Sequence, residues 1–327
     1  MPIPGDPLNR WWLEAEATDD TPDHRHLFGA CVVAFMASNH HSQQELSGTG
    51  FLIAGTPAFA VGITAKHVLS EGVLNIQRPR QRYAQSALQE FLPPSARAPN
   101  FEPERVMALW LGTNNQTALN VAYCTYEEES DLSCYILRPQ ETETTFLPVS
   151  VPLDTTTPNV GDVVHMVSQN GLNITNEQID PRFAEGSFKI TVGRRLTLRC
   201  GVVTGVFPQG YRQYRWPCFT TSMPAEPGMS GGFVYIPRDG VPISACGIVC
   251  ADNSSDEARA SFLDSGESVI GCAWSALGLR IPPSFPVTSY VTLYEMMRSN
   301  RLPMAFGGID HLELIELENN GYRLQQR

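Results

Sequence analysis

Short apolar runs separated by turn residues divide most of this chain, and this rhythm limits the folds that it can adopt. The runs are rich in valine, isoleucine, phenylalanine and tyrosine, and turn residues separate them, as is typical of β-strands. They fall into two series. The first series comprises residues 28–37, 48–55, 58–65, 105–112, 118–126 and 132–139. The second series comprises residues 161–169, 187–194, 196–207, 231–237, 242–251 and 268–277.

Two sets of roughly six strands favour an all-β protein with two antiparallel barrels or sandwiches. Amphipathic helices do not alternate with the strands, so a βαβ fold is a poor match. The chain has 327 residues, 42% of them hydrophobic, which is enough for two cores. We expect a first unit at 28–145 and a second at 146–280, joined near the proline- and threonine-rich segment 139–160.

The remaining segments differ from the strand series. Residues 1–27 form a polar, acidic extension whose obvious anchors are Trp11 and Trp12. Residues 77–100 predict a long loop with one helical turn. At 281–327 the sequence predicts a helix over 288–301, from its apolar spacing, and then a β-hairpin over 311–325 that turns at the Asn-Gly pair 320–321.

The charge balance argues against several classes of partner. The formal net charge is -11, whereas nucleic-acid binding uses a basic surface, and the basic run 78–82 (RPRQR) is short enough to be a solvated loop. The sequence shows no apolar stretch long enough to span a membrane and no secretory leader, so we expect a cytoplasmic protein that binds neither nucleic acid nor membrane.

The eight cysteines lack zinc-ligand spacing, so the sequence predicts no metal and no cofactor. Many of them lie in apolar runs, where free cysteine behaves as a small buried hydrophobe. In an oxidising compartment, Cys200 could pair with Cys218 or Cys246 with Cys272.

Ser230, in the segment PGMSGG at 227–232, is either part of a plain surface turn or a nucleophile on a glycine-rich loop. A serine hydroxyl attacks only when a base takes its proton and an acid orients the base. His67 suits the base because it ends the apolar run FAVGITAKH, where the chain leaves the sheet. Asp131 suits the acid because it opens the run DLSCYIL, although the acidic stretch 127–129 offers rivals.

Three segments resemble the active-site motifs of the chymotrypsin/trypsin-like serine peptidases: TAKH at 64–67, DLSCYIL at 131–137 and PGMSGG at 227–232. They occur in the family's order of His, Asp and Ser. The stretch TSMPAEPGMSGGFVYI is most similar to the bacterial HtrA and glutamyl-endopeptidase branch, and the resemblance covers roughly 28–280. It implies that the two units are six-stranded antiparallel β-barrels.

The resemblance also implies roles for individual residues. Ser230 attacks the scissile carbonyl, His67 is the general base and then the general acid, and Asp131 orients His67. The backbone amides of Gly228 and Ser230 form the oxyanion hole. Met229 replaces the aspartate that a freed N-terminus pairs with in the zymogen-activated branch, so we expect no activation by cleavage of that kind.

The resemblance gives weaker guidance on specificity. Pro224 takes the place of the aspartate of a trypsin-type pocket, which argues against a preference for basic side chains. Cys250, Ala251 and Asp252 match the strand that lines the primary pocket and pairs with the substrate backbone. Small residues there favour a small or medium apolar side chain, whereas Asp252 favours a basic one. The tail after Arg280 is too short for a PDZ domain.

The sequence therefore predicts a serine endopeptidase that acts on protein or peptide substrates. The N-terminal extension, the 77–100 loop and the tail hairpin are candidates for control or for docking a regulatory protein. One alternative is a non-catalytic binding module on the same fold. Another is a serine esterase, because GMSGG matches G-x-S-x-G, although an α/β-hydrolase places its histidine after the serine and only His311 follows Ser230.

Overall fold

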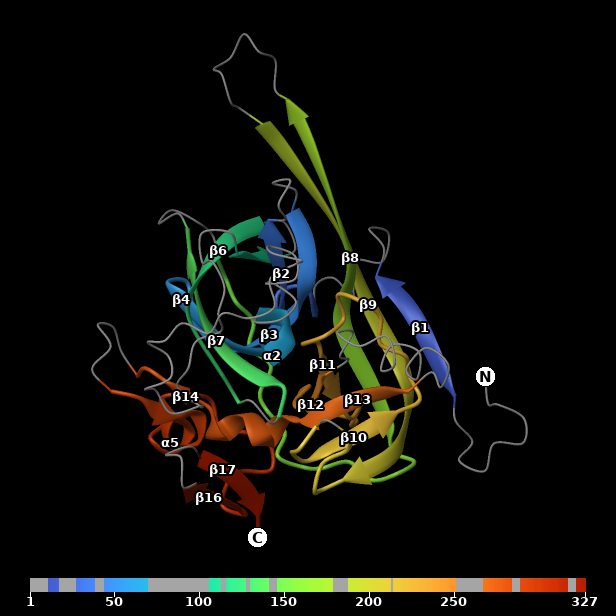
Figure 1. Ribbon diagram of the computed structural model, residues 1–327, viewed down its shortest axis with the longest axis vertical. Helices are drawn as coiled ribbons and strands as arrows, with labels where there is room; N and C mark the ends of the chain where they lie inside the picture. The colour runs from blue at the N-terminus through green and yellow to red at the C-terminus, as the bar shows by residue number, and fades with distance from the viewer. Residues whose placement is uncertain are drawn as a thin grey trace.

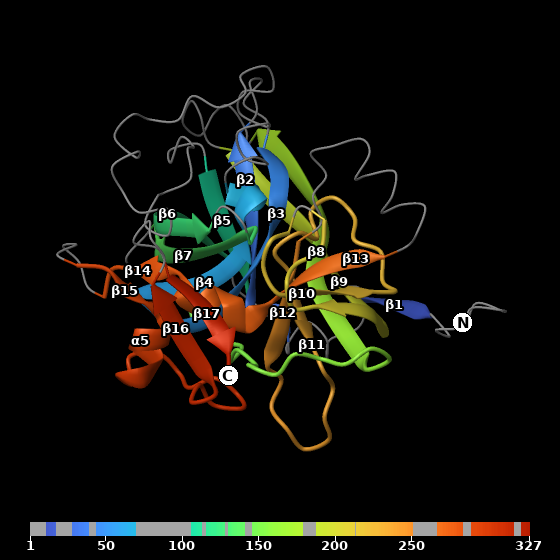
Figure 2. The same cartoon turned by 60° about the horizontal axis from the view of Figure 1, so that its bottom comes forward.

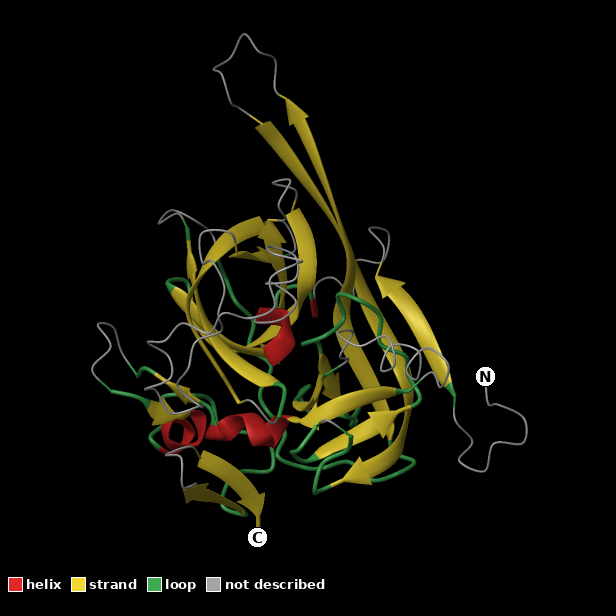
Figure 3. Ribbon diagram, viewed as in Figure 1, coloured by secondary structure: helices red, strands yellow, loops and turns green. Residues whose placement is uncertain are grey.

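The structure is a computed structural model of the chain, and it consists of two β-barrels side by side with a small C-terminal layer packed against them (Figures 1 and 3). Within the part of the chain that it describes, no helix is long and apolar enough to cross a membrane. It describes residues 11–17, 28–38, 44–69, 106–112, 116–127, 130–140, 146–178, 188–212, 214–250, 267–283, 289–316 and 322–327.

The first barrel closes in the antiparallel order β2-β3-β4-β7-β6-β5. Its core contains Phe35 and Tyr135, whose rings meet edge to face with centroids 4.9 Å apart. The Tyr135 hydroxyl is buried and donates a 2.9 Å hydrogen bond to the Phe51 carbonyl. All six strands predicted for this region are confirmed. They are β2 (Val32–Ser38), β3 (Gln44–Thr56), β4 (Phe59–Ala65), β5 (Val106–Leu111), β6 (Gln116–Glu127) and β7 (Leu132–Pro139).

The second barrel has the order β9-β10-β13-β12-β11-β8 and closes through the pairing of β8 with β9, again antiparallel throughout. The prediction of two six-stranded antiparallel barrels is therefore confirmed. Beyond the barrel, β8 and β9 continue as a two-stranded ribbon that projects from the molecule (Figure 1). The strands are β8 (Val163–Gln178), β9 (Phe188–Phe207), β10 (Cys218–Thr221), β11 (Phe233–Tyr235), β12 (Ala245–Val249) and β13 (Ser268–Cys272).

Three features of the second barrel differ from the sequence-based prediction. The runs 187–194 and 196–207 form one strand, β9, because pairing with β8 continues on both sides of Arg195, where the register shifts. Strand β10 was not predicted. The run 268–277 is a strand only as far as Cys272, where the chain turns into the 3-10 helix η4 (Ala273–Gly278).

The N-terminal extension contributes a strand that the sequence did not indicate. Strand β1 (Trp12–Ala17) pairs antiparallel with β9 on the outside of the second barrel, with Trp12 opposite Gly201 and Ala17 opposite Leu196. Both views show β1 lying along β9 (Figures 1 and 2). Residues 12–17 are thus joined to the barrel that carries Ser230.

The C-terminal segment forms the layer seen at the bottom of Figure 1, and it contains the predicted helix and hairpin. Helix α5 (Leu293–Arg298) is shorter than predicted because a capping box of Thr292 and Glu295 sets its start and Asn300, at φ 55°, follows its end. The predicted Asn-Gly turn at 320–321, the basic run 78–82 and the 77–100 loop lie outside the described residues. The strands here are β14 (Arg280–Ile281), β15 (Val291–Thr292), β16 (Leu312–Glu316) and β17 (Tyr322–Gln326).

The second half of the segment between the barrels packs into the molecule. Residues 146–160 include the buried side chains of Leu153 and Asp154. The Asp154 carboxylate pairs with Arg238 at 2.7 Å, and its backbone bridges to Phe306 of the C-terminal segment. The domain boundaries at 27/28, 145/146 and 280/281 stay predictions.

Candidate active site

His67 lies on a single helical turn, α2 (Lys66–Leu69), where the chain leaves β4. Its backbone N–H donates a 3.1 Å hydrogen bond to Oδ1 of Asp131, and its ring Nδ1 lies 2.8 Å from Oδ2 of the same carboxylate. The neighbouring Lys66 N–H donates to the Asp131 carbonyl at 2.8 Å. Three hydrogen bonds therefore fix the position of His67 relative to Asp131.

Asp131 lies just before β7, in the left-handed region at φ 55°, which aspartate tolerates better than most residues. Both side chains are mostly buried, at 13% exposure for His67 and 16% for Asp131. A carboxylate only accepts hydrogen bonds, so the short contact requires the proton on Nδ1. This leaves Nε2 as the acceptor nitrogen of the imidazole.

Ser230 is buried on the loop between β10 and β11. Strand β3 of the first barrel contacts this loop directly. The Thr49 N–H donates to the Ser230 carbonyl at 2.8 Å, and the Thr49 hydroxyl donates to the Gly228 carbonyl at 2.8 Å. Two residues earlier on β3, the Ser47 hydroxyl donates to the Val68 carbonyl at 2.6 Å, next to His67. One short stretch of β3 therefore holds both the Ser230 loop and the turn that carries His67.

The glycines around Ser230 are required by the backbone. Gly228 has φ +92° and Gly231 has φ +84°, which side chains with a Cβ resist. A Cβ on Gly231 would also collide with the Thr49 carbonyl and the Thr64 hydroxyl, and would lie 3.1 Å from the backbone nitrogen of Ala65, two residues before His67. The loop thus approaches the end of β4 closely enough that only glycine fits.

Met229 lies between the two predicted oxyanion donors, and its backbone N–H already makes a hydrogen bond. The Met229 N–H donates to the Glu226 carbonyl at 3.0 Å, and the Gly232 N–H donates back to the Met229 carbonyl at 3.0 Å. The amides of Gly228 and Ser230 stay the predicted donors.

The residues predicted for substrate binding are only partly described. Cys250, just after β12, is buried, with its sulfur 4.0 Å from the Asp131 carbonyl, so this end of β12 lies beside the His67–Asp131 pair. The carbonyl of Pro224 accepts a hydrogen bond from Arg199, on the side of the loop that faces β9. Ala251 and Asp252 lie outside the described residues, as do residues 128–129 of the rival acidic stretch.

All eight cysteines are free thiols, and seven are buried, so neither pairing considered for them is present. Burial raises the pKa of several of these thiols, including Cys218, whose pKa rises to about 12, and Cys250. They are therefore protonated at neutral pH and poor nucleophiles. Within the described ranges, no three His, Cys, Asp or Glu side chains gather closely enough to hold a metal ion.

Three residues near Ser230 were missed by the sequence reasoning: Thr49, Arg199 and Glu226. Arg199 is buried in β9 and binds Glu226, four residues before Ser230. A lone arginine inside an apolar run indicates a buried charge that needs partners, which was an available signal. Nothing in the sequence connects that arginine, or a threonine of β3, with the Ser230 loop.

Two closed six-stranded barrels, with His67 and Asp131 on one and Ser230 on the other, define a trypsin-like fold. No family model matches the chain, and no curated protein matches it. Among solved structures, GrC is similar at 12% identity and a TM-score of 0.40, over 76% of this chain and 91% of that one. Human heparin binding protein is similar at 11% identity and a TM-score of 0.40, over 80% of this chain and 90% of that one. The strand pairings alone define the fold, because sequence identities and TM-scores this low do not support an assignment.

Proposed function

We propose that this protein is a serine endopeptidase that uses His67, Asp131 and Ser230. The observation that carries the proposal is the pair of hydrogen bonds between the Asp131 carboxylate and His67, one to the ring and one to the backbone. A carboxylate that binds both groups sets the tautomer and the orientation of the imidazole together. This is the task of the acid in a catalytic triad.

In the proposed reaction, His67 takes the proton of the Ser230 hydroxyl as its oxygen attacks the substrate carbonyl. The amides of Gly228 and Ser230 stabilise the oxyanion, and each is worth about 10²–10³ in rate. His67 then gives its proton to the leaving amine, and an acyl-enzyme forms on Ser230. Water, activated by the same imidazole, hydrolyses the acyl-enzyme and returns the proton to Ser230.

The proposed substrate is an extended protein or peptide segment that pairs with the chain following β12, beside Cys250. In a primary pocket at Pro224, Cys250, Ala251 and Asp252, the small residues favour a small or medium apolar side chain, whereas Asp252 favours a basic one, and profiling of cleaved peptides decides between them. The motif around Ser230 supports a place near the bacterial HtrA and glutamyl-endopeptidase branch, and only that motif supports it. An α/β-hydrolase esterase is not compatible with a serine on an antiparallel barrel.

The test is covalent labelling with a fluorophosphonate probe, which reacts with an activated serine. Wild type should be labelled and Ser230→Ala should not. Ser275→Ala is the matched control, because Ser275 is also buried, on η4, and its hydroxyl has no hydrogen-bond partner among the residues that the structure describes. It should be labelled like wild type.

A second measurement separates the function classes. Labelled protein that also cleaves an unfolded protein substrate supports the endopeptidase. Labelling with hydrolysis of small esters alone would indicate an esterase. A correctly folded wild type that is neither labelled nor active would overturn the proposal and favour a binding module on the same fold.

A further inference from the structure

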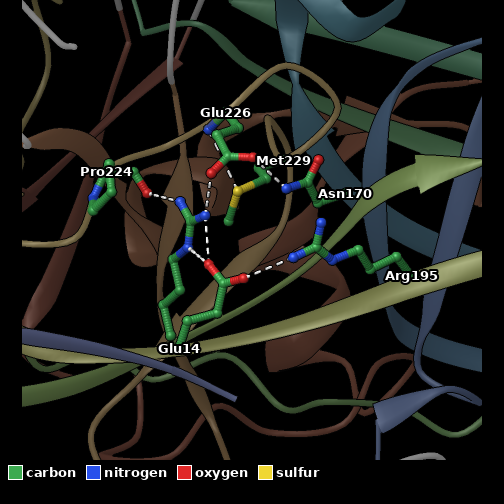
Figure 4. Close-up of polar contacts among 7 residues, drawn as sticks. Glu14, Asn170, Arg195, Pro224, Glu226 and Met229 are labelled. Atoms are coloured by element: carbon green, nitrogen blue, oxygen red, sulfur yellow. Dashed lines mark hydrogen bonds and ion pairs between the residues drawn. The ribbon is translucent and has the colours of Figure 1, made fainter. Parts of the chain in front are cut away.

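A buried guanidinium group lies behind the Ser230 loop, on the side away from the first barrel. The side chain of Arg199, on β9, is only 1% exposed. Its partners are the carboxylates of Glu14 and Glu226 and the carbonyl of Pro224. Figure 4 shows the two carboxylates on either side of one guanidinium group. A buried cation costs several kcal/mol unless it is paired, so this arrangement depends on both carboxylates.

On one side, the guanidinium group holds the segment that leads into Ser230. Besides Arg199, the Glu226 carboxylate accepts from the amide of Asn170 at 2.5 Å. Burial raises the pKa of Glu226, but the hydrogen bonds from Arg199 and Asn170 and the positive charge of Arg199 outweigh it and lower this pKa. The Glu226 carbonyl then accepts from Met229, the residue before Ser230. Glu226 therefore connects Arg199 to the predicted oxyanion loop.

On the other side, the guanidinium group is held by the N-terminal strand. Glu14 lies directly opposite Arg199 in the pairing of β1 with β9, and its Oε2 is 2.6 Å from Arg199 Nε. The Trp12 ring lies against the guanidinium group, with its centroid 5.3 Å away. Arg195 binds the second oxygen of Glu14 at 3.1 Å. Two carboxylates and two guanidinium groups thus make a neutral cluster beside the pairing of β1 with β9 (Figure 4).

We propose that β1 positions the Ser230 loop, with Glu14 and Arg199 as positioning residues that act through Glu226. When Glu14 holds one edge of the guanidinium group, the other edge is aimed at the Pro224 carbonyl and Glu226. Without that carboxylate, Arg199 turns toward water along the edge of β9 and releases both contacts. The loop from Glu226 to Ser230 then keeps its contacts with the first barrel and with Asn170, but it loses those with Arg199.

The experiment compares Glu14→Gln with Glu16→Gln in the full chain. Both substitutions remove one carboxylate from β1, but Glu16 lies opposite Thr197 rather than Arg199, so it is the matched control. Amide hydrogen exchange of residues 226–232 reports the loop without any assumption about activity. Melting temperature reports the fold. Fluorophosphonate labelling, resolved into the affinity for the probe and the rate of bond formation at saturation, reports Ser230.

In Glu14→Gln we expect exchange in 226–232 to quicken by about 10- to 100-fold, the effect of losing a charged hydrogen bond. The saturated labelling rate should fall by about 10², as for a displaced catalytic group, while the affinity for the probe stays unchanged. Glu14→Asp should recover part of both. Glu16→Gln should behave like wild type.

The inference is overturned if Glu14→Gln is folded and its loop exchanges as slowly as that of Glu16→Gln. The labelling part rests on the proposed function, and the exchange part does not. If wild type is not labelled but Glu14→Gln still loosens the loop, the coupling stands and the peptidase proposal fails. If Glu14→Gln does not fold, Glu14→Asp supplies the same comparison, because aspartate keeps the carboxylate but its shorter side chain moves it away from Arg199.

Discussion

Replacing Asp131 with asparagine should separate catalysis from stability more cleanly than any other change in this site. The asparagine carbonyl keeps the acceptor for the His67 backbone N–H, now 3.1 Å from Oδ1. The amide NH₂ takes the place of Oδ2 beside Nδ1, and because it can only donate, Nδ1 must become the acceptor. The imidazole proton then moves to Nε2, and the ring no longer accepts a proton from Ser230.

The two effects differ in size. The position has φ 55°, where asparagine is as well tolerated as aspartate, and one of the two hydrogen bonds survives unchanged. We therefore expect the free energy of unfolding to change by less than about 1 kcal/mol. The wrong tautomer should lower the rate of turnover by about 10⁴. That is about 5.5 kcal/mol in activation free energy, several times the change in stability.

Asp131→Ala is the comparison. It removes both hydrogen bonds and puts a methyl side chain in the left-handed region, which costs about 1–2 kcal/mol on its own. It should therefore lose both stability and activity. The assay is fluorophosphonate labelling together with thermal melting of wild type and both variants. Labelling of Asp131→Asn at a rate close to that of wild type would refute the reasoning, because Asp131 would then not set the tautomer of His67.

Three further changes test the packing and the electrostatics around the site. Gly231→Ala should lower the free energy of unfolding by more than about 3 kcal/mol, because φ is +84° and the new methyl group collides with the Thr49 carbonyl. Chemical denaturation measures this free energy, and an unchanged value would contradict the loop geometry. Glu226 has a lowered pKa in the folded state, so its contribution to stability is present above its ordinary pKa of 4.5 and is lost as the pH falls through the folded value. Wild type should thus be more stable than Glu226→Gln at pH 7, and acid titration of the two melting curves should bring them together; a difference that grows in acid would contradict this sign. Tyr135→Phe should cost about 1 kcal/mol by thermal melting, since it removes one buried hydrogen bond to the Phe51 carbonyl. No change would contradict a contribution of this hydrogen bond to stability.

The sequence predicted the first barrel strand by strand because each strand there is a distinct apolar run between turn residues. It failed where pairing with a distant strand, rather than local composition, decides the structure. Gly193 and Arg194 interrupt the apolar pattern of β9, yet β8 pairs across both of them. Strand β10 has four residues and follows Pro217, so its sequence gives little signal on its own.

Strand β1 is the clearest example of this limit. Its sequence, WLEAEA, is too polar and too short to indicate a strand, and two of its residues are glutamates. Its backbone is held by the edge of β9, which lies about half the chain away in sequence, and its Glu14 by a charge on that same edge. Local propensity contains no information about either partner, so a tertiary contact overrides it.

The motif spacing could indicate His67, Asp131 and Ser230, but not what holds them together. The first two lie on one barrel and Ser230 on the other, so the site exists only if the two barrels are fixed relative to each other. On one side of the Ser230 loop, Thr49 binds the carbonyls of Gly228 and Ser230. On the other side, Arg199 binds Glu226. The loop is thus held between β3 and β9, and β9 is itself covered by the N-terminal strand. The loop that carries Ser230 is therefore held by residues far from it in sequence, such as Thr49 and Arg199, which is why motifs near the serine are not sufficient to define its geometry.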